Sequence, residues 1–383
     1  MNNNEYKIGL VAFSDNPAGT IPLSNLINII TNLSTNSHCI IVEPKTAQNN
    51  IVRRNFKIDV TKVNHVQGHF PFNRVFSYII SQIKISFHIF RLKARVDTWF
   101  FFLGDGLLIP IMIGKLLRKN VVLIFGGSVE KEAEISKQTL YKIICQIKKL
   151  NCSLVTNIIV YSDILIDSWG LSRHREKIVV APQHYIDFQK FKSNEKFNEK
   201  NNLVGFIGRF SQEKGILNLL EAIPGILEIK PDTTFLIIGN GPLSKIVENS
   251  PVLLEHQAQI KLIGWTKHDD LPYYMNQLKV IVIPSYTEGL PNVMLEAMAC
   301  GAAVLATPVG SIPDFIKDGV TGFITENNSS ECISRNVLRV LGEPRLEIIS
   351  NNGHKLVEND FTFDKVVNRY TKLLESYRVS LHR

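Results

Sequence analysis

The chain has 383 residues, of which 45% are hydrophobic and 20% charged, and its formal net charge is +8. This composition is that of a globular protein and excludes a fibrous or disordered one. The chain is longer than a single hydrophobic core usually supports, so we expect two domains. The five cysteines are scattered, odd in number and without metal-ligand spacing, which favours reduced thiols in the cytoplasm over a disulfide framework. They are Cys39, Cys145, Cys152, Cys300 and Cys332. Residues 1–7 are polar and do not resemble a secretory signal.

The positive charge is concentrated in the first half of the chain. Residues 1–188 hold 22 Lys and Arg against 13 Asp and Glu, whereas residues 189–383 hold 21 against 22. The excess peaks between Arg74 and Lys149 and indicates an anionic partner, either nucleic acid or a membrane surface. Aromatic and aliphatic side chains interleave with the charges in residues 74–95. This favours a helix that faces a membrane or packs on protein, and an ordinary amphipathic helix with a solvated basic face remains the alternative.

Short apolar runs in the first half predict strands that alternate with turns and helices. The expected strands are residues 8–13, 39–42, 100–103, 121–125, 158–162 and 178–181, with a helix over 23–33. Residues 98–117 are apolar over the length of a membrane span, but Asp105 between two glycines divides them into a strand, a turn and a helix. The alternation predicts a parallel, doubly wound sheet.

Residues 187–202 are polar and aperiodic and are interpreted as an interdomain linker, after which the strand pattern restarts at Leu203. Further strands are expected at 204–207, 280–283 and 304–306.

Two charged clusters follow the strands of the second half. Arg209 and Lys214 stand between a strand and a helix that begins near Gly215, a place where two cations suit a diphosphate. Glu288 lies in the loop after residues 280–283. Glu296 is four residues beyond Asn292, so Asn292 and Glu296 share one face of the helix that follows. Acids at these places can grip hydroxyl-rich ligands in the crevice of an open α/β sheet. A charged loop and a solvated helix face are the alternative.

Residues 284–310 resemble the E-x7-E signature of glycosyltransferase family 4, the group 1 retaining transferases with the GT-B fold. Residues 204–215, 235–242, 260–265 and 309–323 resemble other blocks of that family, in the same order along the chain. The resemblance implies an α/β protein of GT-B type, with two Rossmann-like, doubly wound parallel-sheet domains that face a central cleft. It implies an acceptor domain over 1–188 together with a C-terminal helix at about 364–383, and a nucleotide-sugar domain over 189–363.

The same resemblance assigns roles to individual residues. Arg209 and Lys214 are expected to hold the donor phosphates and, with Glu288 on the transferred sugar, to form the catalytic group. Glu296 is expected to bind the ribose. The other expected donor contacts are Gly19, Thr20, Gly208, Gly239, Gly264, Trp265, Gly289, Leu290, Pro291 and Asn292.

The acceptor side departs from the family pattern. Where many members carry a His after an N-domain strand, this chain has Phe125 or Gly126, so the acceptor contact is assigned to Gly126, Gly127 and Ser128. His184 is a further candidate, with a hydrogen-bonded loop His as the alternative. The N-terminal Gly loop is also reduced to the single Gly19.

The resemblance implies a retaining transferase that moves a sugar from a UDP- or GDP-sugar to a hydroxyl acceptor, lipid-linked or saccharide, in cell-surface polysaccharide or glycan biosynthesis. The nucleoside diphosphate sugar is a co-substrate, and no metal, other cofactor or nucleic acid is expected. A cytoplasmic protein, peripheral on the inner face of the cell membrane, fits the basic and apolar first half. The alternative is a non-catalytic sugar-nucleotide-binding subunit of a glycan-assembly complex. A 2-epimerase and a pyridoxal-phosphate-dependent phosphorylase are less favoured rivals.

Overall fold

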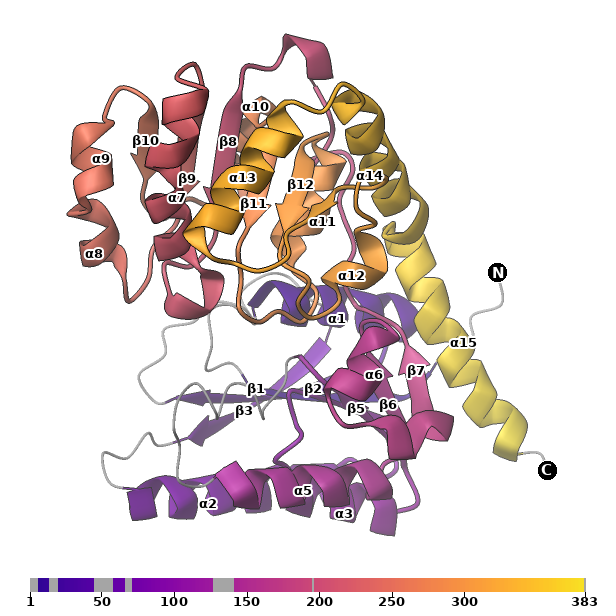
Figure 1. Cartoon of the computed structure of the whole chain (residues 1–383). Helices are drawn as coiled ribbons and strands as arrows, with labels where there is room; N and C mark the ends of the chain where they lie inside the picture. The colour runs from indigo at the N-terminus through magenta and orange to yellow at the C-terminus, as the bar shows by residue number, and fades with distance from the viewer. Residues whose placement is uncertain are drawn as a thin grey trace. The chain divides into compact units, whose positions relative to one another are not determined.

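The computed structural model describes residues 6–13, 20–44, 58–65, 71–126, 141–194 and 196–381. The chain divides into two compact units, one formed by residues 1–184 with 364–383 and the other by residues 185–363. Each unit is built on one wholly parallel sheet with helices beside it (Figure 1). The expected α/β class with two doubly wound parallel sheets is thereby confirmed.

The first sheet has seven strands in the order β3-β2-β1-β4-β5-β6-β7. All side chains of β4 are buried, as are all but the first of β5, because helices cover both faces of this sheet. The strands are β1 (Ile8–Phe13), β2 (Ser37–Pro44), β3 (Ile58–His65), β4 (Thr98–Phe102), β5 (Asn120–Ile124), β6 (Asn157–Val160) and β7 (Ile178–Val180).

The helices of the first unit lie on the two faces of its sheet (Figure 1). Helix α1 covers one face, while α2, α3 and α5 lie side by side over the other. Their bounds are α1 (Thr20–Leu33), α2 (Pro71–Arg91), α3 (Leu108–Leu116), α5 (Tyr141–Leu154), α6 (Ile164–Ser168) and α15 (Phe363–Leu381).

Helix α15 follows the second unit in sequence but packs in the first. Tyr370 is fully buried, its ring lies 5.9 Å from that of Phe100, and its hydroxyl donates to the carbonyl of Ala181 at 3.2 Å. Seven residues later, about two helical turns on, the Tyr377 hydroxyl donates to Asn157 at 2.7 Å. Two buried aromatic rings with satisfied hydroxyls are a strong reason for the chain to return here.

The second sheet has six strands in the order β10-β9-β8-β11-β12-β13. The chain runs outward from β8 through β9 to β10 and then restarts at β11 on the other side of β8. The strands are β8 (Leu203–Ile207), β9 (Thr234–Ile238), β10 (Ile260–Ile263), β11 (Val280–Ile283), β12 (Ala303–Ala306) and β13 (Phe323–Ile324).

Helices and short 3-10 turns connect these strands. The apolar side of α7 packs with α13 over a core of Val, Leu, Ile and Phe from the sheet. The helices are α7 (Ile216–Ile229), α8 (Ser244–Glu248), α9 (Pro251–Glu255), α10 (Leu271–Gln277), α11 (Asn292–Ala299), α12 (Ile312–Phe315), α13 (Ser330–Leu341) and α14 (Leu346–Asp360), and the 3-10 turns in this unit are η4 (Phe197–Glu199), η5 (Gln212–Lys214) and η6 (His268–Asp270).

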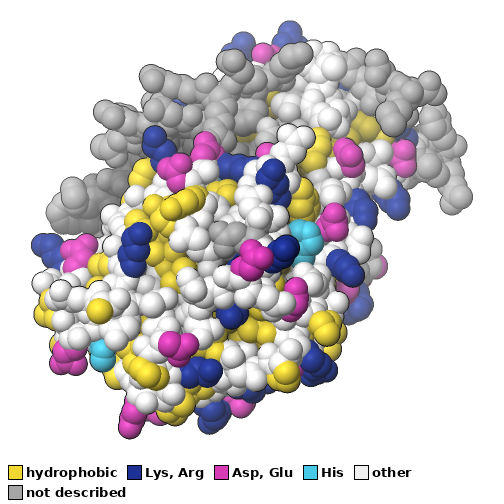
Figure 2. All heavy atoms as spheres, turned by 90° about the horizontal axis from the view of Figure 1, so that it is seen from above, with side chains coloured by type: hydrophobic (Ala, Val, Ile, Leu, Met, Phe, Trp, Pro, Cys, Tyr) yellow, Lys and Arg dark blue, Asp and Glu magenta, His cyan; other side chains and the backbone are white. Residues whose placement is uncertain are grey.

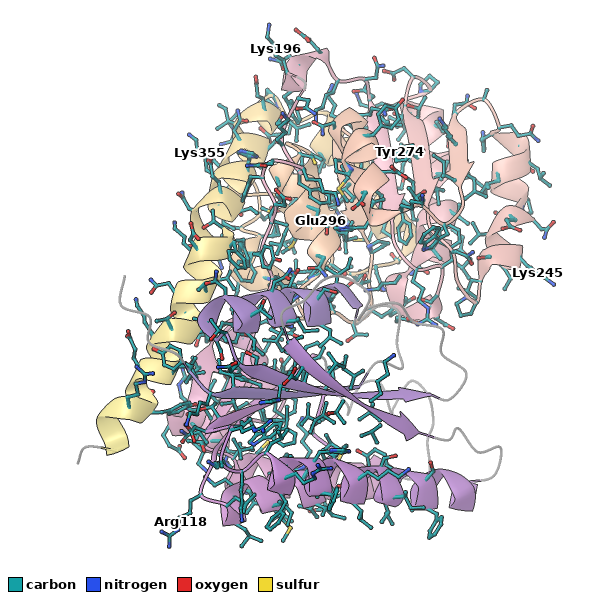
Figure 3. The ribbon with its side chains drawn as sticks, turned by 180° about the vertical axis from the view of Figure 1, so that it is seen from behind. Arg118, Lys196, Lys245, Tyr274, Glu296 and Lys355 are labelled. Carbon is teal, nitrogen blue, oxygen red and sulfur yellow. The ribbon has the colours of Figure 1, made fainter. Side chains whose placement is uncertain are left out.

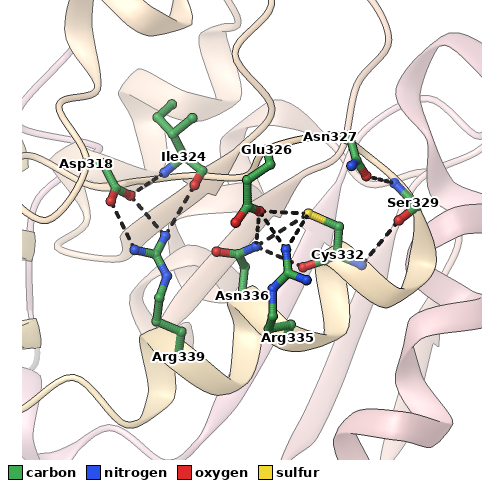
Figure 4. Close-up of polar contacts among 9 residues, drawn as sticks. All are labelled: Asp318, Ile324, Glu326, Asn327, Ser329, Cys332, Arg335, Asn336 and Arg339. Carbon is green, nitrogen blue, oxygen red and sulfur yellow. Dashed lines mark hydrogen bonds and ion pairs between the residues drawn. The ribbon is translucent and has the colours of Figure 1, made fainter.

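A polar network fixes α13 to the chain around β13 (Figure 4). The Ser329 hydroxyl accepts from the Cys332 N–H at 3.2 Å and caps the helix. Arg339 makes two hydrogen bonds to Asp318, at 2.9 and 3.0 Å, and these bonds lower the pKa of the Asp318 carboxyl. Side chains of α13 therefore hold β13, the last strand of the sheet, in position.

The structure agrees with the sequence prediction for one segment and differs from it for another. Residues 98–116 form β4 and α3 as expected, and no helix in the described part of the chain is long and apolar enough to cross a membrane. The polar run 187–202, interpreted as a linker, is instead packed in the second unit, where Phe191, Phe197 and Lys200 are buried. Its aromatic side chains, spaced among charged ones, supply the apolar contacts that a solvated linker would lack.

Candidate active site

The candidate site lies at the carboxyl ends of β8 and β11, where the strand order of the second sheet reverses. Parallel sheets bind ligands at such a switch point, because the loops from the two strands diverge there. The loop after β8 carries Arg209 and Lys214, and the loop after β11 carries Glu288. Sheet topology alone therefore places the three expected catalytic residues on neighbouring loops of one unit.

The loop after β8 is held close to the end of β11 by a glycine. Gly215 ends η5 with a φ of +67°, in the left-handed region, and a Cβ on it would lie 2.0 Å from the carbonyl oxygen of Pro284. The Tyr286 N–H donates to the carbonyl of Glu213 at 2.8 Å and joins the same two loops. Lys214 is thus brought against the loop that carries Glu288.

Glu288 is held by a cation and a hydroxyl. The Lys214 ammonium lies 2.7 and 2.8 Å from its two carboxylate oxygens, and the Ser285 hydroxyl donates to one of them at 2.8 Å. The Glu288 side chain is only 7% exposed, against 30% for Lys214. A buried carboxylate needs such partners, and they fix its position in the site. Ser285 was not among the predicted site residues.

The backbone around Glu288 is packed from the other side by the loop after β12. Gly310 has a φ of +62°, and a Cβ there would lie 2.3 Å from the Glu288 carbonyl oxygen and 2.7 Å from that of Gly289. The Ser311 N–H donates to the Gly289 carbonyl at 2.8 Å, and the Leu290 side chain is buried. The buried Leu290 side chain therefore anchors the loop.

Helix α11 carries the second acid of the motif. Pro291 is its N-cap residue and Asn292 its first residue, so Asn292 and Glu296 share a face as the spacing predicted. Glu296 is 5% exposed, and its carboxylate lies 2.7 Å from Nε2 of His268. Figure 3 shows Glu296 in the interior of the ribbon, whereas the labelled Lys196, Lys245 and Lys355 project outward.

His268 is, with Ser285, a site residue that the sequence did not single out. It lies in η6, and its ring is 5.2 Å from that of Phe191. Its only sequence signal was its place in the loop after residues 260–265, because 28 positions separate it from Glu296. The pair sets a hydrogen-bonding side chain beside the acid that was expected to bind a ribose.

Three further expected donor residues lie at the ends of β8, β9 and β10. The backbones of Gly208 and Gly239 touch, since a Cβ on Gly239 would lie 1.9 Å from the Gly208 carbonyl oxygen. A Cβ on Gly264 would meet no atom within 4 Å, and the next residue, Trp265, is 71% exposed. A large exposed aromatic ring beside an open backbone offers a surface that a flat ligand can cover.

Arg209 stands apart from the Lys214–Glu288 pair. Its guanidinium is 3.8 Å from Glu213, the far limit of an ion pair, and its side chain is about half exposed (47%). A half-exposed guanidinium keeps donors available for a phosphate, to which it can bind in a bidentate way.

The expected residues of the first unit are described only in part. Gly19, Gly127 and Ser128 lie outside the described residues, and Thr20 is the first residue of α1. Gly126 follows β5, where a Cβ would lie 2.2 Å from a methyl of Leu103. His184 is fully buried with its ring 4.8 Å from that of Tyr161, and burial lowers its pKa to about 3. This burial favours a structural role for His184, but its Nδ1 has no hydrogen-bond partner among the described residues, unlike the hydrogen-bonded loop His that the sequence had left as the alternative.

Within the described ranges, no group of three or more His, Cys, Asp or Glu side chains could hold a metal ion. The candidate site of the second unit contains two cations, two buried acids, a histidine and an exposed tryptophan.

Comparison with known proteins matches residues 187–356 to the family model of glycosyl transferases group 1. The chain is 30% identical over 246 residues to the capsular polysaccharide biosynthesis glycosyltransferase CapM of Staphylococcus aureus, covering 60% of this chain and 64% of CapM. It is 28% identical over 214 residues to the UDP-Gal:alpha-D-GlcNAc-diphosphoundecaprenol alpha-1,3-galactosyltransferase of Escherichia coli, covering 52% of this chain and 54% of that enzyme. The chain thus spans about half the length of the curated relatives it matches.

Solved structures resemble the chain over nearly its whole length. Anabaena HepE in complex with UDP gives a TM-score of 0.76 at 16% identity, covering 96% of this chain and 99% of HepE. Sucrose-phosphate synthase from Thermosynechococcus elongatus gives a TM-score of 0.75 at 16% identity, covering 97% and 99%. At these identities the likeness concerns the fold, and it agrees with the two parallel sheets. The family match covers the unit that carries the switch point: residues 187–356 match the group 1 glycosyltransferases, and the chain has the GT-B fold.

Proposed function

We propose that this protein is a retaining glycosyltransferase that moves a sugar from a nucleoside diphosphate sugar to a hydroxyl acceptor. The observation that carries the proposal is the arrangement of Lys214 and Glu288, paired at 2.7 Å at the switch point, with the half-exposed Arg209 on the same loop as Lys214. Two cations and a buried acid at the ends of adjacent parallel strands suit a diphosphate joined to a sugar.

In the proposed reaction, Arg209 and Lys214 bind the donor diphosphate and stabilise the charge that develops as the bond between the sugar carbon and the phosphate oxygen breaks. The acceptor oxygen forms the new bond to that carbon on the same face, and its proton passes to the leaving phosphate. A donor phosphate would compete with Glu288 for the Lys214 ammonium, so Glu288 would be released toward the sugar hydroxyls as the donor binds.

Glu296 is proposed to accept hydrogen bonds from the ribose hydroxyls. Its carboxylate already has one partner in His268 at 2.7 Å, which orients one oxygen and leaves the other able to accept. The exposed ring of Trp265 and the open backbone at Gly264 would border the base.

We further propose a UDP- or GDP-sugar as donor, with a lipid-linked or saccharide acceptor used in cell-surface polysaccharide synthesis. Support comes from the names of the relatives, one of which belongs to capsular polysaccharide biosynthesis and another of which uses UDP-Gal and a diphosphoundecaprenol-linked sugar. Such an acceptor would place the protein in the cytoplasm at the inner face of the cell membrane.

The first test is thermal unfolding of the protein with UDP, GDP, ADP and CMP, each with and without EDTA. One diphosphate is expected to raise the melting temperature without a metal, and Glu296→Ala should remove that shift. Glu358→Ala, at an exposed position on α14, is the matched control and should keep it. No shift with any nucleotide at millimolar concentration would contradict the donor site.

Turnover separates the enzyme from a non-catalytic sugar-nucleotide-binding subunit. The enzyme should release the nucleoside diphosphate from the donor faster when an acceptor extract is present, and the anomeric configuration in the product should match that of the donor. Binding without release under any acceptor condition would favour the non-catalytic subunit.

A further inference from the structure

Helix α2 carries an exposed apolar stripe, although Ile85 and Ile89 are buried on its inward side. Five large hydrophobic side chains between 41% and 59% exposed recur at helical spacing and form one stripe along its outer face. We call this stripe, Phe76, Ile79, Ile83, Phe87 and Phe90, the α2 face. A surface helix of a soluble domain normally turns such a stripe inward, so its outward position indicates a partner that covers it.

The inward side of α2 is fixed by polar contacts and cannot simply exchange places with the α2 face. Ser81, Gln82 and Ser86 are buried there. The Gln82 side-chain oxygen accepts from the N–H of Ile109 at 3.0 Å and so satisfies a first-turn donor of α3. Ser81 and Ser86 donate to backbone carbonyls one turn earlier. Rotation of the helix would bury the phenylalanines but leave these polar groups to find new partners.

Cations border the α2 face. Lys84 and Arg91 are exposed on its flank, the Arg91 guanidinium lies 5.8 Å from the Phe87 ring centre, and the Lys93 ammonium lies 4.5 Å from that of Phe90. The helices α2, α3 and α5 contain no Asp or Glu. Arg118, just after α3, projects away from the ribbon (Figure 3). By contrast, the surface drawn in Figure 2 mixes acidic and basic side chains.

The charges decide between the possible occupants. A second copy of the chain meeting this face through a two-fold axis would set like cations close together, which is unfavourable. An anionic lipid surface offers both partners that the face requires, acyl chains for the aromatic and aliphatic stripe and negative headgroups for the lysines and arginines. A helix of this kind lies in the plane of the interface, consistent with the finding that no described helix can span a bilayer.

We propose that the α2 face docks on an anionic lipid bilayer, with Phe76, Phe87 and Phe90 inserted at the level of the headgroups. The inference extends the proposed function by giving a membrane-proximal acceptor a binding surface. It does not depend on turnover, and therefore the two proposals can fail separately.

The test is co-sedimentation of the full chain with vesicles of phosphatidylcholine alone or mixed with phosphatidylglycerol, at low and at high salt. The wild type is expected to bind the mixed vesicles at low salt, with weaker binding as salt screens the headgroups. The triple variant Phe76→Ser, Phe87→Ser, Phe90→Ser and the double variant Lys84→Glu, Arg91→Glu should each bind about tenfold more weakly.

Matched controls use exposed residues elsewhere. Leu254→Ser on α9 and Lys245→Glu on α8 should bind vesicles as the wild type does, and all variants should unfold at the temperature of the wild type because the changed side chains are exposed. The inference is overturned if the wild type does not bind mixed vesicles at low salt, binds neutral vesicles as tightly as mixed ones, or binds mixed vesicles no more tightly than the triple variant does. A concentration-dependent dimer that only the triple variant loses would assign the face to a second copy instead.

Discussion

The α2 face of the first unit and the switch point of the second unit place charge in opposite ways. Around α2 the cations are exposed and the apolar side chains face outward with them, whereas at the switch point the acids are buried and each is paired. An exposed cation can attract any anionic surface but fixes no geometry. A buried pair orients its atoms and so suits a ligand with defined groups. Under the two proposals, recognition of a lipid surface and recognition of a nucleotide sugar belong to separate parts of the chain.

The largest effect is expected from the buried pair. Lys214→Ala and Glu288→Gln should each lower kcat/KM for sugar transfer roughly 100- to 1000-fold, because each removes a preorganised charge from the site. Steady-state kinetics with the donor identified by thermal shift would measure this. A double-mutant cycle should show that the two losses do not add, since the side chains contact each other. Activity near that of the wild type in either variant would remove the residue from the catalytic group.

Lys200 tests whether a buried charge in the second unit always serves the ligand site. Its ammonium donates to the carbonyls of Leu278, Cys300 and Gly301 at 3.1 to 3.2 Å, and the residue is 4% exposed. Lys200→Met should reduce the free energy of unfolding by about 1–3 kcal/mol, because buried carbonyls lose a donor. Lys196→Met, at an exposed position, should change it by less than about 0.5 kcal/mol. Denaturant titration would decide, and equal effects would contradict the structural role.

His184 provides a pH-dependent test in the first unit. Burial lowers its pKa to about 3 in the folded state, so only the unfolded chain takes up the proton as the pH falls below the unperturbed value of about 6.5. The free energy of unfolding should therefore fall with pH from about 6.5 downward, by up to about 2 kcal/mol at pH 5. His184→Gln should reduce this loss, and His174→Gln, at a partly exposed position, should not. Thermal melts at about pH 7.5 and pH 5 would measure the difference. An unchanged pH response in His184→Gln would refute it.

The smallest effect is expected at the exposed ion pair of α13. Arg339→Gln removes a bidentate partner from Asp318 and should cost about 0.5–1 kcal/mol of unfolding free energy near neutral pH. Because Arg339 lowers the pKa of the folded-state carboxyl, the contribution is present above the unfolded pKa of Asp318 and is lost as the pH falls through the folded value. The unfolding free energies of the wild type and the variant should become equal in acid. A difference in unfolding free energy that persists in acid would point to packing of Arg339 on Phe323.

Some elements followed from local patterns and others did not. The apolar runs that became β1, β4, β5, β8, β11 and β12 were recognised because buried parallel strands are apolar throughout. Strand β3, Ile58–His65, was missed because it lies at the edge of its sheet and mixes Asp, Thr, Lys and Asn with its apolar residues. The run 187–202 was interpreted as a linker because its few aromatic residues form no periodic apolar pattern.

The sequence by itself determined much of the alternation of strands and helices, the resemblance to group 1 glycosyltransferases and the face shared by Asn292 and Glu296, since each depends on residues close together in the chain. Only the tertiary structure decided that Lys214 pairs with Glu288 across 74 positions, that His268 meets Glu296, and that α2 turns its phenylalanines outward. Such contacts depend on which strand ends are neighbours and which helix side finds polar partners. Those choices are made by sheet topology and by packing, and no local spacing of residues records them.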